Sequence, residues 1–415
     1  MTRATVVGAG LAGLSAAVAL REAGVPVTIV EAAAQAGGRC RSYHDPQIGR
    51  VIDNGNHLVL SGNAAVHRFR DRIGAKTPLA GPPDASFAFA DLATGKSWTV
   101  RINHGRFPRW IFSRRDRVPG SGVVDYLPIL RLLSTREARV DERFTTIGPV
   151  WEKLLEPVLL AALNTPPGEG SARLTANVLR ETIAKGGAAM RPQVAEPTLA
   201  AAFIDPATAW LAAHDAPVAL GRRLRAIRFD GEVVTGLDWS DGPQPIAPDE
   251  PVILAVPPWV TSALVPDLVV PDSFHAIVNA HFDVVPPSGT PPMLGLLGGT
   301  AEWLFAFDDR LSITVSAADR LVERDREDLA RTFWADICAA LGMAAPLPRW
   351  QVVKEKRATF AATPDQNAKR PPAATRWRNL FLAGDWTDTG LPATIEGALR
   401  SGETAAGLAR AGQSA

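Results

Sequence analysis

The feature that most constrains this chain is a glycine-rich turn at its N-terminus. Residues 3 to 31 read RATVVGAGLAGLSAAVALREAGVPVTIVE, which predicts a strand, a tight turn, an alanine-rich helix and a second strand, together one βαβ unit. In such a unit Gly8 permits the turn, Gly10 lets the backbone approach a pyrophosphate, and Gly13 lets the helix pack closely on the strand. Amide groups at the start of the helix stabilise the phosphate charge. The sequence therefore predicts a dinucleotide site here.

An acidic residue closes the second predicted strand, where the adenosine ribose of a dinucleotide is bound. Glu31 stands 21 residues after Gly10, and a carboxylate there accepts hydrogen bonds from both ribose hydroxyl groups. Shortly after it, Gly38 permits close backbone approach and Arg39 supplies a cation for the pyrophosphate. A solvated basic turn is the alternative for this segment. Because the segment lies just after Glu31, we favour the interpretation that it binds the cofactor.

A second candidate segment lies near the C-terminus. The stretch NLFLAGDWTDTGLPATIEGALRSGETAAGLA predicts a strand, a loop beginning at Gly384-Asp385 and a helix from about Pro392. We interpret the dinucleotide as FAD. Because FAD is long, a segment remote in sequence must complete the flavin half of its site. Asp385 is placed to accept a hydrogen bond from a ribityl hydroxyl, and the helix starting near Thr394 directs its positive end toward the flavin. We interpret Glu396 as a carboxylate favoured by that helix dipole rather than as a catalytic group.

The middle of the chain contains a segment with strand-like alternation. Val218 to Ala255 predicts a hairpin or meander that returns to the nucleotide-binding domain. Within it, Val218 either touches adenine through its backbone or is an ordinary core valine.

Composition limits the classes of protein that remain open. The 415 residues suffice for two or three domains, and 44 Lys and Arg against 43 Asp and Glu give a net charge of +1, which argues against nucleic-acid binding. Two cysteines and seven histidines without paired ligand spacing predict no metal, and so few cysteines fit a reducing cytoplasm. A secretory signal is the alternative for the apolar N-terminus, but a signal does not need three glycines. Prolines interrupt the other apolar runs, so no membrane-spanning segment is expected.

Five segments carry a resemblance to the flavin amine oxidase and phytoene desaturase superfamily: GAGLAG, Glu31, GGRCRS, IDNGNH and GDWTDTGLPATIEGALRSG. Within it, IDNGNH and the C-terminal motif are most similar to the bacterial hydroxysqualene dehydroxylases of hopanoid biosynthesis. The resemblance implies an α/β fold with a discontinuous, Rossmann-like FAD-binding domain and a mixed α+β substrate domain, amine oxidase-like in arrangement. The expected boundaries are 1–75, 215–265 and 372–415 for the FAD-binding domain, and 76–214 and 266–371 for the substrate domain.

The resemblance, together with the glycine turn, also predicts the cofactor contacts. The expected FAD contacts are Gly8, Gly10, Leu11, Ala12, Gly13, Glu31, Ala32, Gly38, Arg39, Gly55, Asn56, Val218, Gly384, Asp385, Thr394 and Ile395. In the amine oxidases of the superfamily, a tyrosine of an aromatic cage stands where this chain has Thr394. The whole chain has only Tyr43 and Tyr126. A large apolar substrate is therefore expected rather than an amine.

In the reaction that the resemblance implies, hydroxysqualene loses its allylic hydroxyl as water and reduced flavin delivers hydride to give squalene. An external electron donor must then reduce the flavin again. An acid would help the hydroxyl leave, and the candidates are His57 and Asp388, either of which could instead orient a loop or cap a turn. Two alternatives remain. One is a carotenoid-type desaturase or amine oxidase that removes hydride from its substrate, and the other is a carrier of flavin or isoprenoid without turnover.

One predicted surface segment suits a lipid bilayer. Residues 101 to 117, RINHGRFPRWIFSRRDR, carry six arginines with Phe107, Trp110, Ile111 and Phe112 between them. Mixed cationic and aromatic surface favours an anionic bilayer, from which a squalene-like substrate would enter. A solvated arginine-rich loop with buried aromatics is the alternative. We expect peripheral binding at the inner face of the cytoplasmic membrane.

Overall fold

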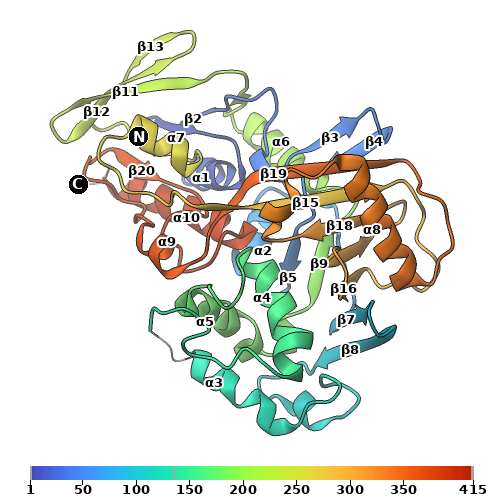
Figure 1. The fold of residues 1–415 in the computed structure, drawn as a ribbon. Coiled ribbons are helices and arrows are strands. Elements are labelled where there is room, and N and C mark those ends of the chain that lie inside the picture. Colours follow the sequence, from blue (N-terminus) through green and yellow to red (C-terminus); the bar gives the residue numbers. More distant parts are fainter. Residues whose placement is uncertain (1, 134–135, 413–415) are drawn as a thin grey trace.

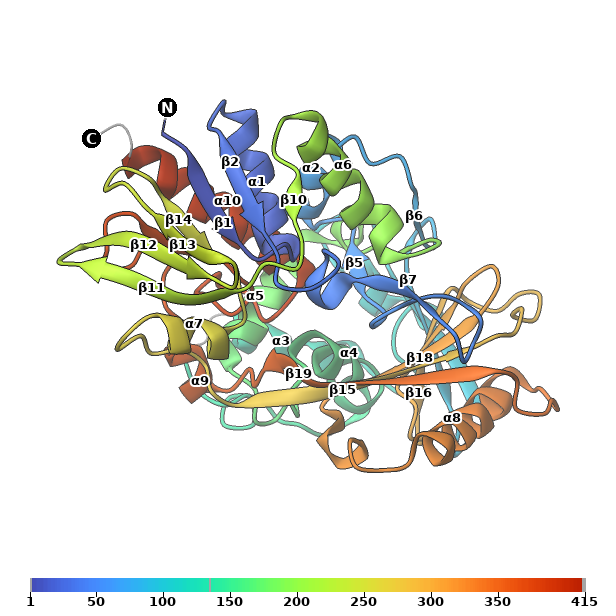
Figure 2. The same cartoon turned by 90° about the horizontal axis from the view of Figure 1, so that it is seen from above.

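Five short parallel strands form the first sheet, although they come from three distant parts of the chain. The computed structural model describes residues 2–133 and 136–412. Figure 2 shows the first sheet beside helices α1 and α10. The strand order is β10–β2–β1–β14–β20, and every neighbouring pair is parallel. The strands are β1 (Ala4–Val7), β2 (Val27–Val30), β10 (Val218–Ala219), β14 (Val252–Leu254) and β20 (Leu380–Leu382). The predicted βαβ unit is confirmed, because helix α1 (Leu11–Glu22) connects β1 to β2.

The first and last helices of the chain pack closely against each other beside this sheet. A Cβ atom at Gly402 of α10 (Ile395–Gly412) would lie 2.3 Å from the carbonyl oxygen of Ala12 in α1. Ser15 Oγ donates a 2.9 Å hydrogen bond to the carbonyl oxygen of Leu399. The C-terminal helix therefore contacts, backbone to backbone, the helix that begins at the glycine turn. The neighbouring helices are α2 (Ala64–Arg72) against α10 and α6 (Asp205–Ala213) against α1.

A three-stranded antiparallel meander leaves the first sheet after β10 and returns to it at β14. Its strands are β11 (Leu224–Asp230), β12 (Val233–Trp239) and β13 (Gly242–Pro245). Asn379 ties the central strand to the start of β20, because its side chain accepts a 2.8 Å hydrogen bond from the Val234 amide and donates a 3.0 Å bond to the Val234 carbonyl. The predicted meander is confirmed. Helix α7 (Pro258–Leu264) follows it.

The second large sheet has seven strands and a core of its own. Its order is β19–β15–β18–β17–β16–β7–β8, antiparallel except for the β16–β7 pair. Helix α8 (Arg326–Leu341) covers one face, where Phe282 and Phe333 are fully buried. Figure 2 shows β15 and β19 running from the side of α7 and α9 to α8. The strands are β7 (Ala85–Asp91), β8 (Lys96–Ile102), β15 (Phe274–Phe282), β16 (Met293–Leu297), β17 (Trp303–Ala306), β18 (Leu311–Val315) and β19 (Trp350–Phe360).

A helical region lies at the lower end of the molecule in Figure 1, away from the first sheet. It contains α3 (Pro128–Leu133), α4 (Glu156–Leu163) and α5 (Ala172–Glu181). Among the described residues, no helix combines the length and the apolar character needed to cross a membrane. The remaining elements are α9 (Pro364–Ala368), the pair β3 (Ser42–Asp45) and β4 (Arg50–Asp53), and the small sheet of β5 (Leu58–Leu60), β9 (Pro192–Ala195) and β6 (Leu79–Ala80).

The boundaries expected between the two domains stay a proposal. Leu199, Phe203 and Leu211, which the prediction assigns to the substrate domain, pack in one hydrophobic cluster with Leu14 and Val18 of α1. This follows from the position of α6 on α1. The segment that ends at α6 therefore shares the core of the first sheet.

The contact between α1 and α10 generates a stability prediction. Gly402→Ala should destabilise the protein, because the new methyl group meets a backbone carbonyl that a side-chain rotation cannot move away. Overpacking of this kind costs about 1 to 3 kcal/mol. Gly407→Ala is the matched control on the same helix: nothing lies within 4 Å of a Cβ there, and the substitution should stabilise by about 0.5 to 1 kcal/mol. Thermal unfolding measures both, and equal midpoints would contradict the contact.

Candidate functional site

The glycine turn between β1 and α1 has the geometry of an anion site. Gly8 has a φ of +104°, and a Cβ there would lie 2.5 Å from the carbonyl oxygen of Ala255. A Cβ at Gly13 would lie 1.8 Å from the carbonyl oxygen of Gly8. Gly10 has nothing within 4 Å of a Cβ, and it precedes α1 without a side-chain cap. Packing within the protein therefore requires two of the glycines, and the third leaves the first amides of α1 open to a phosphate.

Glu31 and the second glycine pair lie against this turn. Glu31 Oε2 accepts a 2.8 Å hydrogen bond from the Ala9 amide, and its Oε1 accepts one of 2.8 Å from the Ala33 amide. A Cβ at Gly38 would lie 3.4 Å from the Cα of Gly10. The structure therefore brings the predicted ribose and pyrophosphate residues together. The other expected contacts at this end lie beside them: Leu11 and Ala12 begin α1, Ala32 follows Glu31, and Val218 pairs with Ile29 of β2 at the sheet edge.

Arg39 and Asp385 form an ion pair that joins the two ends of the chain. Arg39 Nη2 lies 2.6 and 2.7 Å from the two carboxylate oxygens of Asp385, and Nη1 donates a 2.5 Å hydrogen bond to the Ala358 carbonyl of β19. We expected these two side chains to bind different parts of the cofactor. In the structure their charges neutralise each other. Asp385 is buried, and an unpaired carboxylate there would destabilise the fold. Their cofactor contacts stay a prediction.

His57 lies next to this ion pair in its neutral form. Its Nε2 is 3.9 Å from the sulfur of Cys40. Burial and, to a smaller extent, the charge of Arg39 together lower the pKa of His57 to about 4. Burial also raises the pKa of Cys40 to about 12, so the thiol keeps its proton. The site therefore holds an uncharged imidazole and an uncharged thiol near neutral pH.

Asn56 belongs to a buried polar cluster whose other members come from the second sheet. Asn56 Nδ2 donates a 3.1 Å hydrogen bond to Thr314 Oγ1 of β18, which in turn donates a 2.8 Å bond to Asn279 Oδ1 of β15. A Cβ at Gly55 would lie 2.9 Å from Asn279 Nδ2. Asn56 Oδ1 is buried without a partner, which leaves one acceptor for a ligand N–H. Asn279 and Thr314 were missed in the sequence, where their only signal is a polar residue inside an apolar strand.

The loop before α10 is fixed by residues on both sides of it. A Cβ at Gly384 would lie 2.4 Å from Trp386 Nε1, so this position after β20 requires glycine. Arg370, which the sequence did not single out, donates from Nη2 to the carbonyls of Asp385 and Thr387, and its burial lowers its pKa to about 10. Thr394 accepts a 3.0 Å hydrogen bond from the Gly397 amide and so caps α10, which begins at Ile395.

Asp388 lies outside this cluster. Its side chain is 44% exposed, and Oδ1 is 3.7 Å from Arg173 Nη2 of α5. The sequence made it a candidate acid because its segment was expected to face the flavin. In the structure the backbone turns between Asp385 and Asp388, with the Asp388 amide bonded to the Pro371 carbonyl at 2.9 Å. The expected acid therefore lies in a surface ion pair.

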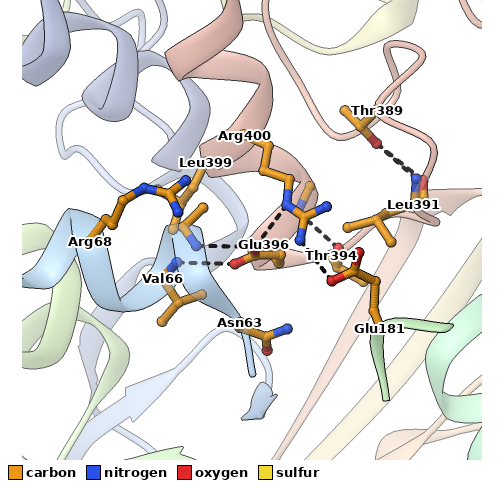
Figure 3. A network of polar contacts seen from close by, with 12 residues as sticks. Asn63, Val66, Arg68, Glu181, Thr389, Leu391, Thr394, Glu396, Leu399 and Arg400 are labelled. Atoms are coloured by element: carbon orange, nitrogen blue, oxygen red, sulfur yellow. Dashed lines mark hydrogen bonds and ion pairs between the residues drawn. The ribbon is translucent and has the colours of Figure 1, made fainter. Parts of the chain in front are cut away.

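Glu396 connects three helices. Its carboxylate accepts hydrogen bonds of 3.1 and 3.0 Å from the amides of Ala65 and Val66 at the start of α2. Figure 3 shows Val66 beside this carboxylate. Arg400 Nε donates a 2.8 Å bond to the same carboxylate, and Arg400 Nη2 lies 3.1 Å from Glu181 of α5. The interpretation of Glu396 as a helix-terminal carboxylate is confirmed, with the difference that the amides it accepts from belong to α2.

The residues fit a dinucleotide that carries a flavin. The turn offers amides without a capping side chain, and Asn56 Oδ1 is an acceptor without a partner. Arg39, although paired with Asp385, keeps 42% of its side-chain surface accessible, so the guanidinium can still be reached by a ligand. Among residues 2–133 and 136–412, no group of three or more His, Cys, Asp or Glu is arranged to hold a metal.

Comparisons with known proteins agree with this geometry. The family model of flavin containing amine oxidoreductases matches residues 11–409. The chain is 49% identical over 405 residues to hydroxysqualene dehydroxylase from Rhodopseudomonas palustris, covering 97% of each chain, and 47% identical over 405 residues to that from Zymomonas mobilis, covering 97% of this chain and 98% of the relative. Cyclohexylamine oxidase from Brevibacterium oxydans has the same fold, with a TM-score of 0.69 at 16% identity over 99% of both chains. The expected amine oxidase-like fold is confirmed.

The Glu396 network generates the second stability prediction. Glu396→Gln replaces one acceptor oxygen by an NH₂ group, so one amide of α2 loses its partner and Arg400 loses a carboxylate. Loss of about 2 to 3 kcal/mol is expected. Glu403→Gln is the matched control on the same helix, because Glu403 pairs with Arg68 and Arg72 at the surface, where such pairs contribute about 0 to 1 kcal/mol. Denaturant unfolding compares them, and a larger loss for Glu403→Gln would refute the assignment.

Proposed function

The chain belongs to the flavin containing amine oxidoreductase family, and from that membership we propose that it is a hydroxysqualene dehydroxylase. Such an enzyme replaces the hydroxyl group of hydroxysqualene by hydrogen and releases squalene and water. As a family member the protein is an oxidoreductase with FAD as its cofactor. The observation that carries the proposal is the extent of the match, since two hydroxysqualene dehydroxylases share nearly half of its residues over 97% of the chain. The likeness thus includes the region of the second sheet.

We assign the two halves of FAD to the two ends of the site. The adenosine and pyrophosphate belong at the turn of Gly8 to Gly13, with Glu31 on the ribose, and the flavin belongs near Asn56 and the start of α10. When bound and reduced, FAD supplies the hydride. Asn56 Oδ1 would accept a hydrogen bond from the cofactor, and the positive end of α10 beside Thr394 would stabilise negative charge on it. Arg39 and Asp385 hold the walls of the site together through their ion pair.

The threonine at 394 and the position of Tyr126 favour an uncharged substrate over an amine. Thr394 caps α10 where amine oxidases of the superfamily carry a tyrosine. Tyr126 is buried in the helical region, where its hydroxyl lies 3.0 Å from both the Ser121 hydroxyl and the Val118 amide. It therefore takes no part in an aromatic cage beside α10. This supports an isoprenoid substrate.

Neither side chain expected to protonate the leaving hydroxyl suits that task. The pKa of His57 is about 4, so its acidic form is scarce near neutral pH. Asp388 is exposed and paired with Arg173. We therefore assign His57 a positioning role beside Arg39 and Cys40, and Asp388 a role in holding α5 to the loop before α10.

We propose two partners outside the chain. Each turnover consumes one hydride, so an external electron donor must reduce FAD between cycles. The substrate is a lipid, and we place the enzyme at the cytoplasmic face of the membrane as a peripheral protein.

Anaerobic mixing tests the reaction and its direction. Photoreduced enzyme mixed with hydroxysqualene should regain the absorption of oxidised flavin and form one squalene per flavin. Oxidised enzyme mixed with putrescine or with a polyene is the control and should keep its absorption. The reverse outcome, in which reduced enzyme stays reduced and the amine or polyene bleaches the oxidised form, would identify an oxidase or desaturase. Absence of both reactions would identify a carrier.

The low pKa of His57 predicts how acid affects the enzyme. His57→Gln should leave the shape of the kcat profile unchanged between about pH 6 and about pH 9, because the imidazole is neutral throughout. The fold favours the neutral ring, so His57 costs stability as the pH falls from 6.5 toward 4, and the variant should lose part of this acid sensitivity. His44→Gln, at an exposed histidine, is the control. If His57→Gln instead removed a limb of the kcat profile near neutral pH, His57 would be identified as the acid.

A further inference from the structure

Exposed apolar side chains concentrate in one short part of the chain. Twelve large hydrophobic residues of the described chain are exposed, and six of these lie between residues 107 and 147, each more than half exposed. They are Phe107, Phe112, Val124, Leu127, Leu130 and Ile147. A monomeric protein normally scatters such residues singly, and a cluster marks a contact with another apolar partner.

The helical turns at 123–133 are apolar on two sides. Tyr126, Ile129 and Leu132, spaced three residues apart, are buried in the core of the helical region. Val124, Leu127 and Leu130 have the same spacing and are exposed. A surface helix turns polar residues to water. The second apolar stripe on η3 (Val123–Tyr126) and α3 is thus unexplained by the fold of the monomer.

An arginine-rich turn adjoins this stripe. Helix η2 (Arg109–Phe112) contacts η3, and Figure 1 shows α3 at the lower end of the molecule. Residues 101–117 hold six arginines against the single Asp116. Phe107 and Phe112 stack on each other at the surface, with ring centroids 6.2 Å apart. The exposed arginines beside them are Arg106, Arg109, Arg114 and Arg115.

Trp110 does not belong to this surface. It is buried, and its ring meets Tyr126 edge to face with centroids 5.0 Å apart. The sequence suggested that the aromatics of 101–117 either all face a bilayer or are all buried. The structure separates them: Trp110 anchors the turn in the core, and Phe107 and Phe112 face outward.

We propose that the exposed side chains of 106–130 form a docking surface for an anionic lipid bilayer, here termed the η2–α3 surface. Its apolar members are Phe107, Phe112, Val124, Leu127 and Leu130, and its cationic members are Arg106, Arg109, Arg114 and Arg115. The apolar side chains enter the boundary between headgroups and acyl chains, and the arginines pair with lipid phosphates. The charge selects a bilayer over a second copy of the chain, because a symmetric dimer through this surface would bring two sets of arginines together. The proposal stands on this surface alone and does not depend on the reaction.

Vesicle co-sedimentation of the holoenzyme tests the surface. The wild type should bind vesicles of phosphatidylcholine with phosphatidylglycerol and bind phosphatidylcholine alone more weakly. The pairs Leu127→Gln with Leu130→Gln, and Phe107→Ser with Phe112→Ser, should each weaken partitioning by about tenfold or more. Arg114→Gln with Arg115→Gln should weaken it roughly fivefold per charge on anionic vesicles only. Val285→Gln, at an equally exposed valine between β15 and β16, is the matched control and should bind as the wild type does.

Two further measurements keep the outcomes distinct. Turnover with detergent-dispersed substrate should be the same in all of these variants, which separates lipid docking from the proposed reaction. Undiminished vesicle binding by the Leu127 and Leu130 pair, or failure of the wild type to bind either vesicle, overturns the proposal. Sedimentation velocity tests the rival occupant: a wild-type dimer that the same pair dissociates, with vesicle binding unaltered, would assign the surface to a second copy of the chain.

Discussion

The structure depends on the close contact between α1 and α10. Because Gly402 has no side chain, α10 reaches the backbone of α1 at Ala12, within the first turn, whose amides are expected to bind phosphate. Ser401 accepts a 2.8 Å hydrogen bond from the Gly384 amide, so the same helix also fixes the end of β20. The two chain ends are thereby held together, and only then can Arg39 meet a carboxylate 346 positions away. An elongated cofactor needs this arrangement, since no local segment spans its length.

How much of this could be predicted depends on whether the signal is local. The βαβ unit, the meander and the start of α10 follow from glycine spacing, strand alternation and capping within short windows. The pairing of Arg39 with Asp385 has no such signal. Sequence reasoning therefore gave each a separate ligand, whereas burial of the carboxylate makes the arginine its partner. The cofactor contacts remain predictions, with their residues now close together.

The residues that sequence reasoning missed come from the second sheet. Asn279 and Thr314 lie in strands whose neighbours are apolar, and no motif surrounds them. Both side chains join the Asn56 cluster only because β15 pairs with β18 in this register and Gly55 lets the segment of Asn56 approach. The register is not visible in the sequence. The burial of Trp110 could not be predicted for a related reason. Its segment is irregular and has no period from which the buried side could be inferred.

An apolar, water-insoluble substrate makes opposite demands on the inside and the outside of an enzyme. Inside, several titratable groups near the flavin end of the site are compensated or neutral: Arg39 with Asp385, Arg370 on backbone carbonyls, and His57 as an uncharged ring. An unpaired ion there would lose its water whenever such a substrate entered. This desolvation costs on the order of several kcal/mol per ion. Outside, four arginines and two aromatic rings are exposed at 106–115, where a lipid phosphate can neutralise the charge. The neutralised arginines inside and the exposed arginines at 106–115 are therefore both consistent with the proposal that the protein takes an uncharged lipid from a membrane.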